Sequence, residues 1–173
     1  MTIRWGILGT GNIAQLVAAD LALLPNAELV AVGSRSQERA DAFGDTFDVR
    51  HRHDSYEALV DTANLDVVHV ATPHSEHLLH ATMALEAGLA VLCEKPLTLN
   101  AEQADQLIAT ARRCDQFLME AMWTRFLPVM DDVRRLVHDE RRVGRAALAV
   151  RAPDRGHDEQ RERDRHHGPD FEP

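Results

Sequence analysis

A glycine-rich turn near the N-terminus is the first place where residue types and spacing indicate chemistry. The sequence Gly9-Thr-Gly11-Asn-Ile-Ala14 follows an apolar run at residues 3–8 and opens an apolar-periodic stretch at 13–24, for which Asn12 is the expected N-cap. Such glycines permit a tight strand-to-helix turn and let backbone approach a pyrophosphate, which the helix amides then bind. The turn therefore predicts a dinucleotide site comprising Gly9, Thr10, Gly11, Asn12 and Ile13. A tight turn without a ligand is the less favoured alternative, because a second strand follows.

The residues after that second strand indicate which dinucleotide binds. An NAD site usually has Asp or Glu about 20 residues beyond the glycines, to accept hydrogen bonds from the ribose 2′-hydroxyl. This chain has Gly33-Ser34-Arg35 there, with Arg39 one helical turn further on. A hydroxyl and two guanidinium groups suit a 2′-phosphate. We therefore expect NADP, with NAD possible, although a solvated helix face is the usual setting of surface arginines.

Lys95 is the only lysine among the 19 basic residues of the chain. It follows Glu94 at the end of an apolar run, so it belongs to the same sheet edge as the glycine turn. Arginine keeps its proton in the working pH range, whereas burial or a neighbouring positive charge can bring a lysine to titrate there. The position favours a proton-transferring residue over a chance surface lysine paired with Glu94.

A second turn carries two histidines, in the run Ala71-Thr72-Pro73-His74-Ser75-Glu76-His77. Open α/β sheets bind ligands at the carboxyl ends of their strands, so these residues could contact cofactor or substrate. A spacing of three also suits metal ligands, but no carboxylate or Cys lies at a matching position, and we expect no metal. Ordinary helix capping is a further alternative.

These residues need a doubly wound α/β fold to bring them together. Apolar runs at 3–8, 27–33, 65–71, 89–93 and 116–123 predict strands, with a brief strand within 48–53. Helices are expected from Ser36 to about Phe43, from Ser55 to about Thr62, over 75–87 closed by Gly88, and over 101–113 capped by Asn100. The alternation implies a Rossmann-type parallel sheet covered on both faces.

We assign 1–124 to this dinucleotide-binding domain. Residues 125–150 form a linker helix at 129–138 and a strand at 143–150 that begins a second domain, and 151–173 form a disordered tail rich in charged residues.

Composition excludes several functional classes. A net charge of −9 argues against a nucleic-acid binder. No apolar run approaches the roughly 20 residues that cross a bilayer, and the N-terminus lacks a signal-peptide pattern, so we expect a cytoplasmic protein. Cys93 and Cys114 have neither disulfide-framework nor metal-ligand spacing, which favours buried free thiols.

Taken together, the segments GTGNIA, VGSRS, ATPHSEH, CEKPLTLN and MEAMWTRFLP resemble the Gfo/Idh/MocA family of oxidoreductases over roughly residues 3–150. The run at 120–126 is most similar to the branch of dihydrodiol dehydrogenases and NADP-linked xylose dehydrogenases. The resemblance implies that Lys95 contacts the reacting hydroxyl or the nicotinamide ribose as the catalytic residue, with Glu94 beside it. It also allows a cis Lys95–Pro96 peptide bond, and it places Trp123 and Arg125 beside the cofactor.

The activity implied is hydride transfer between NADP and a sugar, polyol or diol hydroxyl. Family members continue into a second α/β domain that completes the active site and forms a homodimer interface, so the chain is expected to be a truncated member, with a frameshift near 143–150 as one origin. Three alternatives stay open: an NADP-dependent oxidoreductase by descent, a non-catalytic NADP-binding module, and an interaction fragment that associates through exposed apolar surface.

Overall fold

A computed structural model describes residues 1–138, which fall into two compact units. The first is Met1–Met122, and the second begins at Trp123. The predicted strand at 143–150 and the predicted disordered tail at 151–173 lie outside the described residues.

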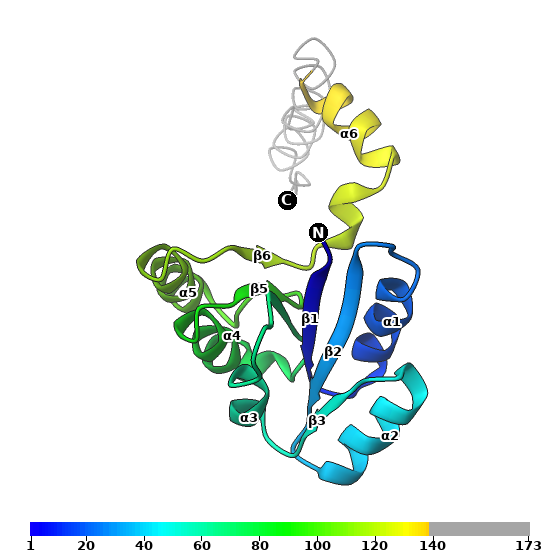
Figure 1. Cartoon of the computed structure of the whole chain (residues 1–173). Coiled ribbons are helices and arrows are strands. Elements are labelled where there is room, and N and C mark those ends of the chain that lie inside the picture. The colour runs from blue at the N-terminus through cyan, green and yellow to red at the C-terminus, as the bar shows by residue number, and fades with distance from the viewer. Residues whose placement is uncertain (139–173) are drawn as a thin grey trace, which may run out of the picture. The chain divides into compact units, whose positions relative to one another are not determined.

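The first unit is a six-stranded sheet in which every neighbouring pair of strands is parallel (Figure 1). Its strand order is β3-β2-β1-β4-β5-β6. The strands are β1 (Ile3–Leu8), β2 (Ala27–Gly33), β3 (His51–His53), β4 (Val67–Val70), β5 (Ala90–Cys93) and β6 (Leu118–Glu120). The chain winds outward from β1 in one direction and then from β4 in the other. The carboxyl ends of β1 and β4 therefore border the switch point at which such sheets bind ligands.

Helices cover both faces of this sheet, which confirms the predicted Rossmann-type architecture. The helices α1 (Asn12–Leu21) and α2 (Gln37–Phe47) pack on one face around Ile7 and Val32. The opposite face is covered by α3 (Tyr56–Val60), α4 (His77–Glu86) and α5 (Ala101–Arg113) (Figure 1). Strands buried on both sides read as near-continuous apolar runs, which is why the sequence made β1 and β2 easy to recognise.

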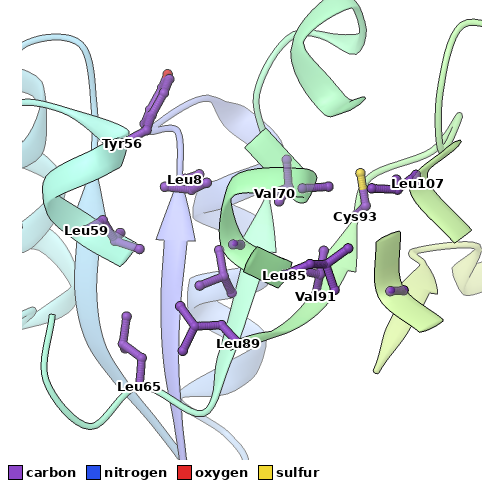
Figure 2. Close-up of a cluster of buried hydrophobic side chains, with 14 of the residues drawn as sticks. Leu8, Tyr56, Leu59, Leu65, Val70, Leu85, Leu89, Val91, Cys93 and Leu107 are labelled. Atoms are coloured by element: carbon purple, nitrogen blue, oxygen red, sulfur yellow. The ribbon is translucent and has the colours of Figure 1, made fainter. Parts of the chain in front are cut away.

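The larger core lies beneath α3, α4 and α5 (Figure 2). Leu8, Val70 and Val91 contribute to it from three adjacent strands, while Leu85 and Leu107 reach it from α4 and α5. All five side chains are fully buried. This packing fixes the strand ends, and with them the loops that carry the predicted site.

Side-chain caps start three of the helices at the predicted residues. Ser36, Ser55 and Asn100 each accept a hydrogen bond from the backbone N–H three residues on, at 3.4, 3.2 and 2.9 Å. The prediction that Asn12 caps α1 is wrong. The carbonyl of Gly11 accepts the first helical hydrogen bond, from Gln15, so Gly11 is the N-cap and Asn12 is already helical.

The other differences concern element ends. The predicted helix at 75–87 is divided into a 3₁₀ turn, η1 (His74–Glu76), and α4. The predicted strand at 116–123 is paired over only three residues, and Trp123 instead begins a second 3₁₀ turn, η2 (Trp123–Phe126). The helix α6 (Val129–His138) has the predicted bounds. None of the described helices is both long enough and apolar enough to cross a membrane.

The two cysteines differ in burial. Cys93 is a buried free thiol, as predicted, whereas Cys114 is only partly buried, so the prediction was wrong there. Burial, together with the nearby Glu94 and Glu120 carboxylates, raises the pKa of the Cys93 thiol to about 12. At pH 8 the Cys93 thiol is therefore almost entirely protonated, and the thiolate is the reactive form.

We accordingly predict that iodoacetamide at pH 8 alkylates Cys114 in the folded chain and leaves Cys93 unmodified. Peptide mass spectrometry distinguishes the two sites. A Cys114→Ser variant should take up almost no label until denaturant is added. Labelling of both cysteines at similar rates under native conditions would contradict the burial described here.

Candidate functional site

A groove of about 730 Å³ runs along the carboxyl ends of β1, β2 and β4. It is lined by eight of the predicted site residues, Gly9, Thr10, Gly11, Ser34, Arg35, Arg39, Thr72 and Pro73, together with Ser36, Glu38, Tyr56 and Ala71. Its volume lies within the usual range for small-molecule sites. Three loops far apart in the sequence therefore meet at the switch point of the sheet.

The two glycines of the first loop have different roles. Gly9 has φ +107°, and a Cβ there would lie 2.7 Å from the carbonyl oxygen of Ala71, so no other residue fits this turn. Its N–H donates to the carbonyl of Gly33, which ties β1 to β2. A Cβ on Gly11 would meet nothing within 4 Å. Gly11 therefore leaves open space beside the N-terminus of α1, where an anionic group can approach the backbone.

Asn12 and Ile13 form the first turn of α1 and are exposed at its N-terminus. The N–H groups of a first helical turn have no partner within the helix and carry its positive dipole end. Both residues can therefore contribute backbone donors to a bound anion.

Cationic side chains surround the groove where β2 ends. Ser34 is buried and its N–H donates to the carbonyl of His53, while Arg35 and Arg39 are exposed and line the groove. No carboxylate occupies the last position of β2, which is Gly33, and Glu38 is the one acidic residue among the lining residues. Two guanidinium groups beside one hydroxyl can bind a phosphate.

Tyr56, the only tyrosine of the chain, is a lining residue that no sequence motif indicated. Burial raises the pKa of its hydroxyl, and the nearby Arg35 guanidinium offsets only part of that increase. The hydroxyl therefore stays protonated at neutral pH and can donate a hydrogen bond. Tyr56 is the single tyrosine of the chain, as Lys95 is the single lysine, and this rarity was the sequence feature that could have indicated it.

The histidines of the second turn have distinct environments. His77 is fully buried, with Nδ1 2.9 Å from the carbonyl oxygen of Pro96 and Nε2 3.0 Å from that of Thr72. The ring thus joins the loop after β4 to the loop after β5. His74 is exposed, and its ring centroid is 5.4 Å from that of His77. Within residues 1–138, no group of three or more His, Cys, Asp or Glu side chains could hold a metal ion.

His80, which the sequence did not single out, supports the same turn. Its Nδ1 lies 3.0 Å from the hydroxyl oxygen of Thr72, and its ring meets Tyr56 edge-on at 4.5 Å. Burial lowers the pKa of His80, so the ring is neutral at neutral pH. An aromatic contact and two hydrogen bonds therefore link Tyr56 through His80 and Thr72 to His77.

Glu94 and Lys95 come directly after β5, at the same edge of the sheet. The N–H of Glu94 donates to the carbonyl of Val70, and the backbone N–H of Lys95 donates to Oε2 of Glu94 at 3.3 Å. The Lys95 side chain is exposed, and the Lys95–Pro96 peptide bond is cis, as the resemblance allowed. Trp123 and Arg125 lie in the second unit, in η2. Their place beside a cofactor stays a prediction.

Comparison with known proteins supports a dinucleotide-binding Rossmann domain. The family model described as "Oxidoreductase family, NAD-binding Rossmann fold" (Gfo/Idh/MocA) matches residues 3–122. A mouse trans-1,2-dihydrobenzene-1,2-diol dehydrogenase is 40% identical over 139 residues, which cover 79% of this chain and 42% of the relative. A D-xylose 1-dehydrogenase (NADP(+)) from Hypocrea jecorina is 43% identical over 149 residues, covering 79% and 38%.

Among solved structures, the chain is similar to KijD10, a 3-ketoreductase from Actinomadura kijaniata determined in complex with NADP. The TM-score is 0.75 at 33% sequence identity, over 80% of this chain and 44% of KijD10. The chain thus spans about two fifths of the length of these relatives. The family model matches most of the first unit, and the observed sheet order and glycine turn agree with it. The chain therefore belongs to the Gfo/Idh/MocA family of oxidoreductases.

Proposed function

We propose that this protein is an NADP-dependent oxidoreductase that transfers a hydride between the nicotinamide ring and a hydroxyl-bearing carbon of a sugar, polyol or diol. The observation that carries the proposal is the groove itself. It combines an open glycine cradle at a helix N-terminus with Ser34, Arg35 and Arg39 and no carboxylate at the end of β2. NAD is the less favoured cofactor, because nothing at that position offers the carboxylate that a free 2′-hydroxyl prefers.

The cofactor halves are assigned to different parts of the sheet edge. The backbone of residues 9–13 would bind the diphosphate, and Ser34, Arg35 and Arg39 would bind the 2′-phosphate. Thr72, Pro73 and His74 would border the middle of the cofactor, and Glu94 and Lys95 its nicotinamide half. His77 has both ring nitrogens on backbone carbonyls, so we assign it the task of holding the two loops rather than binding the cofactor itself.

Lys95 is the residue to which we assign proton transfer. When bound, the nicotinamide ring accepts the hydride that leaves the substrate carbon. The hydroxyl proton of that carbon then passes to Lys95 Nζ, which must be held within hydrogen-bond distance of the substrate oxygen. In the reverse direction the same ammonium returns the proton.

The substrate class rests on the relatives. The curated matches are named for a dihydrodiol and for D-xylose. The chain spans about two fifths of the length of these relatives. We therefore propose, as a separate step, that this chain itself catalyses the reaction. A homodimer is expected only for a full-length family member. We further propose a cytoplasmic protein with no nucleic-acid or membrane partner.

The test is turnover by the purified full chain, followed through the near-ultraviolet absorbance of NADPH. The substrates are D-xylose and trans-1,2-dihydrobenzene-1,2-diol, each with NADP. Turnover that Lys95→Met lowers by about 1,000-fold, with a far smaller loss of NADP affinity, is the expected result. Tight NADP binding with no turnover would instead support a non-catalytic NADP-binding module, and absence of both would refute the proposal.

A further inference from the structure

His69 is an unusual residue for the middle of a parallel sheet. It lies in β4 between Val68 and Val70, and its side chain is fully buried. Its neighbours in register are Ile7 of β1 and Leu92 of β5, both apolar. An apolar side chain at this position would avoid the free-energy cost of burying a polar ring.

The hydrogen bonding of His69 is incomplete. Nε2 lies 3.2 Å from Oε1 of Glu94, whereas Nδ1 is buried and has no partner. Because a carboxylate only accepts, the hydrogen at Nε2 faces Oε1 of Glu94. A buried nitrogen without a hydrogen-bond partner lowers the stability of the fold, so His69 does not serve stability alone.

Both oxygens of the Glu94 carboxyl have a hydrogen-bond partner. Oε1 faces His69, and Oε2 accepts the N–H of Lys95. Burial raises the pKa of Glu94, but the hydrogen bond and charge of His69, with the Lys95 backbone and ammonium, outweigh burial and hold the pKa below its usual value. The carboxylate is thus charged, oriented and only 11% exposed, next to the single lysine of the chain.

We propose that His69 is a positioning residue for the nicotinamide half of the site, acting through the orientation of the Glu94 carboxylate beside Lys95. This inference rests on the proposed function. Neither His69 nor its hydrogen-bond partner Glu94 lines the groove, and the expected effect is confined to one half of the cofactor.

Two ligands and two variants test it by isothermal titration on the full chain. NADP spans both halves of the site, whereas adenosine 2′,5′-bisphosphate carries the adenosine and 2′-phosphate without the nicotinamide. His69→Leu removes the donor, and His69→Gln restores an amide N–H near the position of Nε2. The thermal midpoint of each variant shows whether it is folded.

We expect His69→Leu to weaken NADP binding by about 10-fold, the effect of one lost hydrogen bond to a charged group. Bisphosphate affinity should change by less than about twofold, and His69→Gln should recover most of the NADP affinity. Equal weakening of both ligands, no weakening of either, or failure of His69→Gln to recover NADP binding would overturn the inference. If wild type bound the bisphosphate but not NADP, the inference would fail while the adenosine site stood; if it bound neither, the proposed function would fail as well.

Discussion

Replacing Arg35 with Asp should weaken NADP binding by about 100-fold, because it removes a charge-assisted contact to the 2′-phosphate and adds a repelling carboxylate. Arg35 lines the groove, is exposed, and adjoins Ser34 at the end of β2. NAD binding should be unchanged or stronger, because a carboxylate there can accept hydrogen bonds from a free 2′-hydroxyl. The variant should therefore reverse the order of the two affinities.

Isothermal titration of wild type and variant with both dinucleotides measures this reversal. Arg50→Asp is the matched control, since it makes the same charge change at an exposed arginine that borders a different hollow, with Arg4 and Glu28. The control should retain the wild-type order of affinities. An equal loss of NADP affinity in both variants would assign the effect to net charge and would contradict a specific 2′-phosphate contact.

Replacing Gly9 with Ala should destabilise the first unit by about 3 kcal/mol and abolish dinucleotide binding. The new Cβ would sit 2.7 Å from the Ala71 carbonyl oxygen, and φ of +107° is strained for any L side chain. Gly11→Ala should leave stability within about 1 kcal/mol of wild type, because its Cβ meets nothing. It should nonetheless weaken NADP binding by 10-fold or more, on the order expected when a methyl group enters the diphosphate cradle.

Urea unfolding gives the stability of both variants, and NADP titration gives their binding. The pair separates the two roles of the loop: Gly9 builds the turn, and Gly11 keeps space for the ligand. Normal NADP affinity in Gly11→Ala would show that no ligand approaches that position. Normal stability in Gly9→Ala would contradict the backbone conformation of the turn.

Much of the fold followed from local sequence pattern. β1, β2, α5 and α6 have the predicted bounds, because long apolar runs and a strong cap such as Asn100 are local signals. Predictions failed where the outcome depends on backbone hydrogen bonding instead. Gly11, with no side chain, caps α1 through its carbonyl, and the paired part of β6 ends at Glu120 although the apolar run continues.

The site was predicted only in part for a related reason. Glycine turns and strand-end residues carry short-range signatures, and eight of them do line one groove. Tyr56 reaches that groove from the first residue of α3, and His69 meets Glu94 across 25 residues of sequence. Ligand contact by His77 stays a prediction, and both of its ring nitrogens lie at the backbone carbonyls of Thr72 and Pro96. Such partnerships depend on tertiary packing, which no local pattern encodes.

Thermal unfolding of the full chain in the presence of NADP or NAD tests the proposed NADP site most directly. A ligand that binds only the folded state adds about 2.7 kcal/mol of stability at 100 times its dissociation constant. NADP should raise the unfolding midpoint clearly more than NAD does at equal concentration. A midpoint that neither dinucleotide moves, or that NAD raises more than NADP, would contradict an NADP site in this groove.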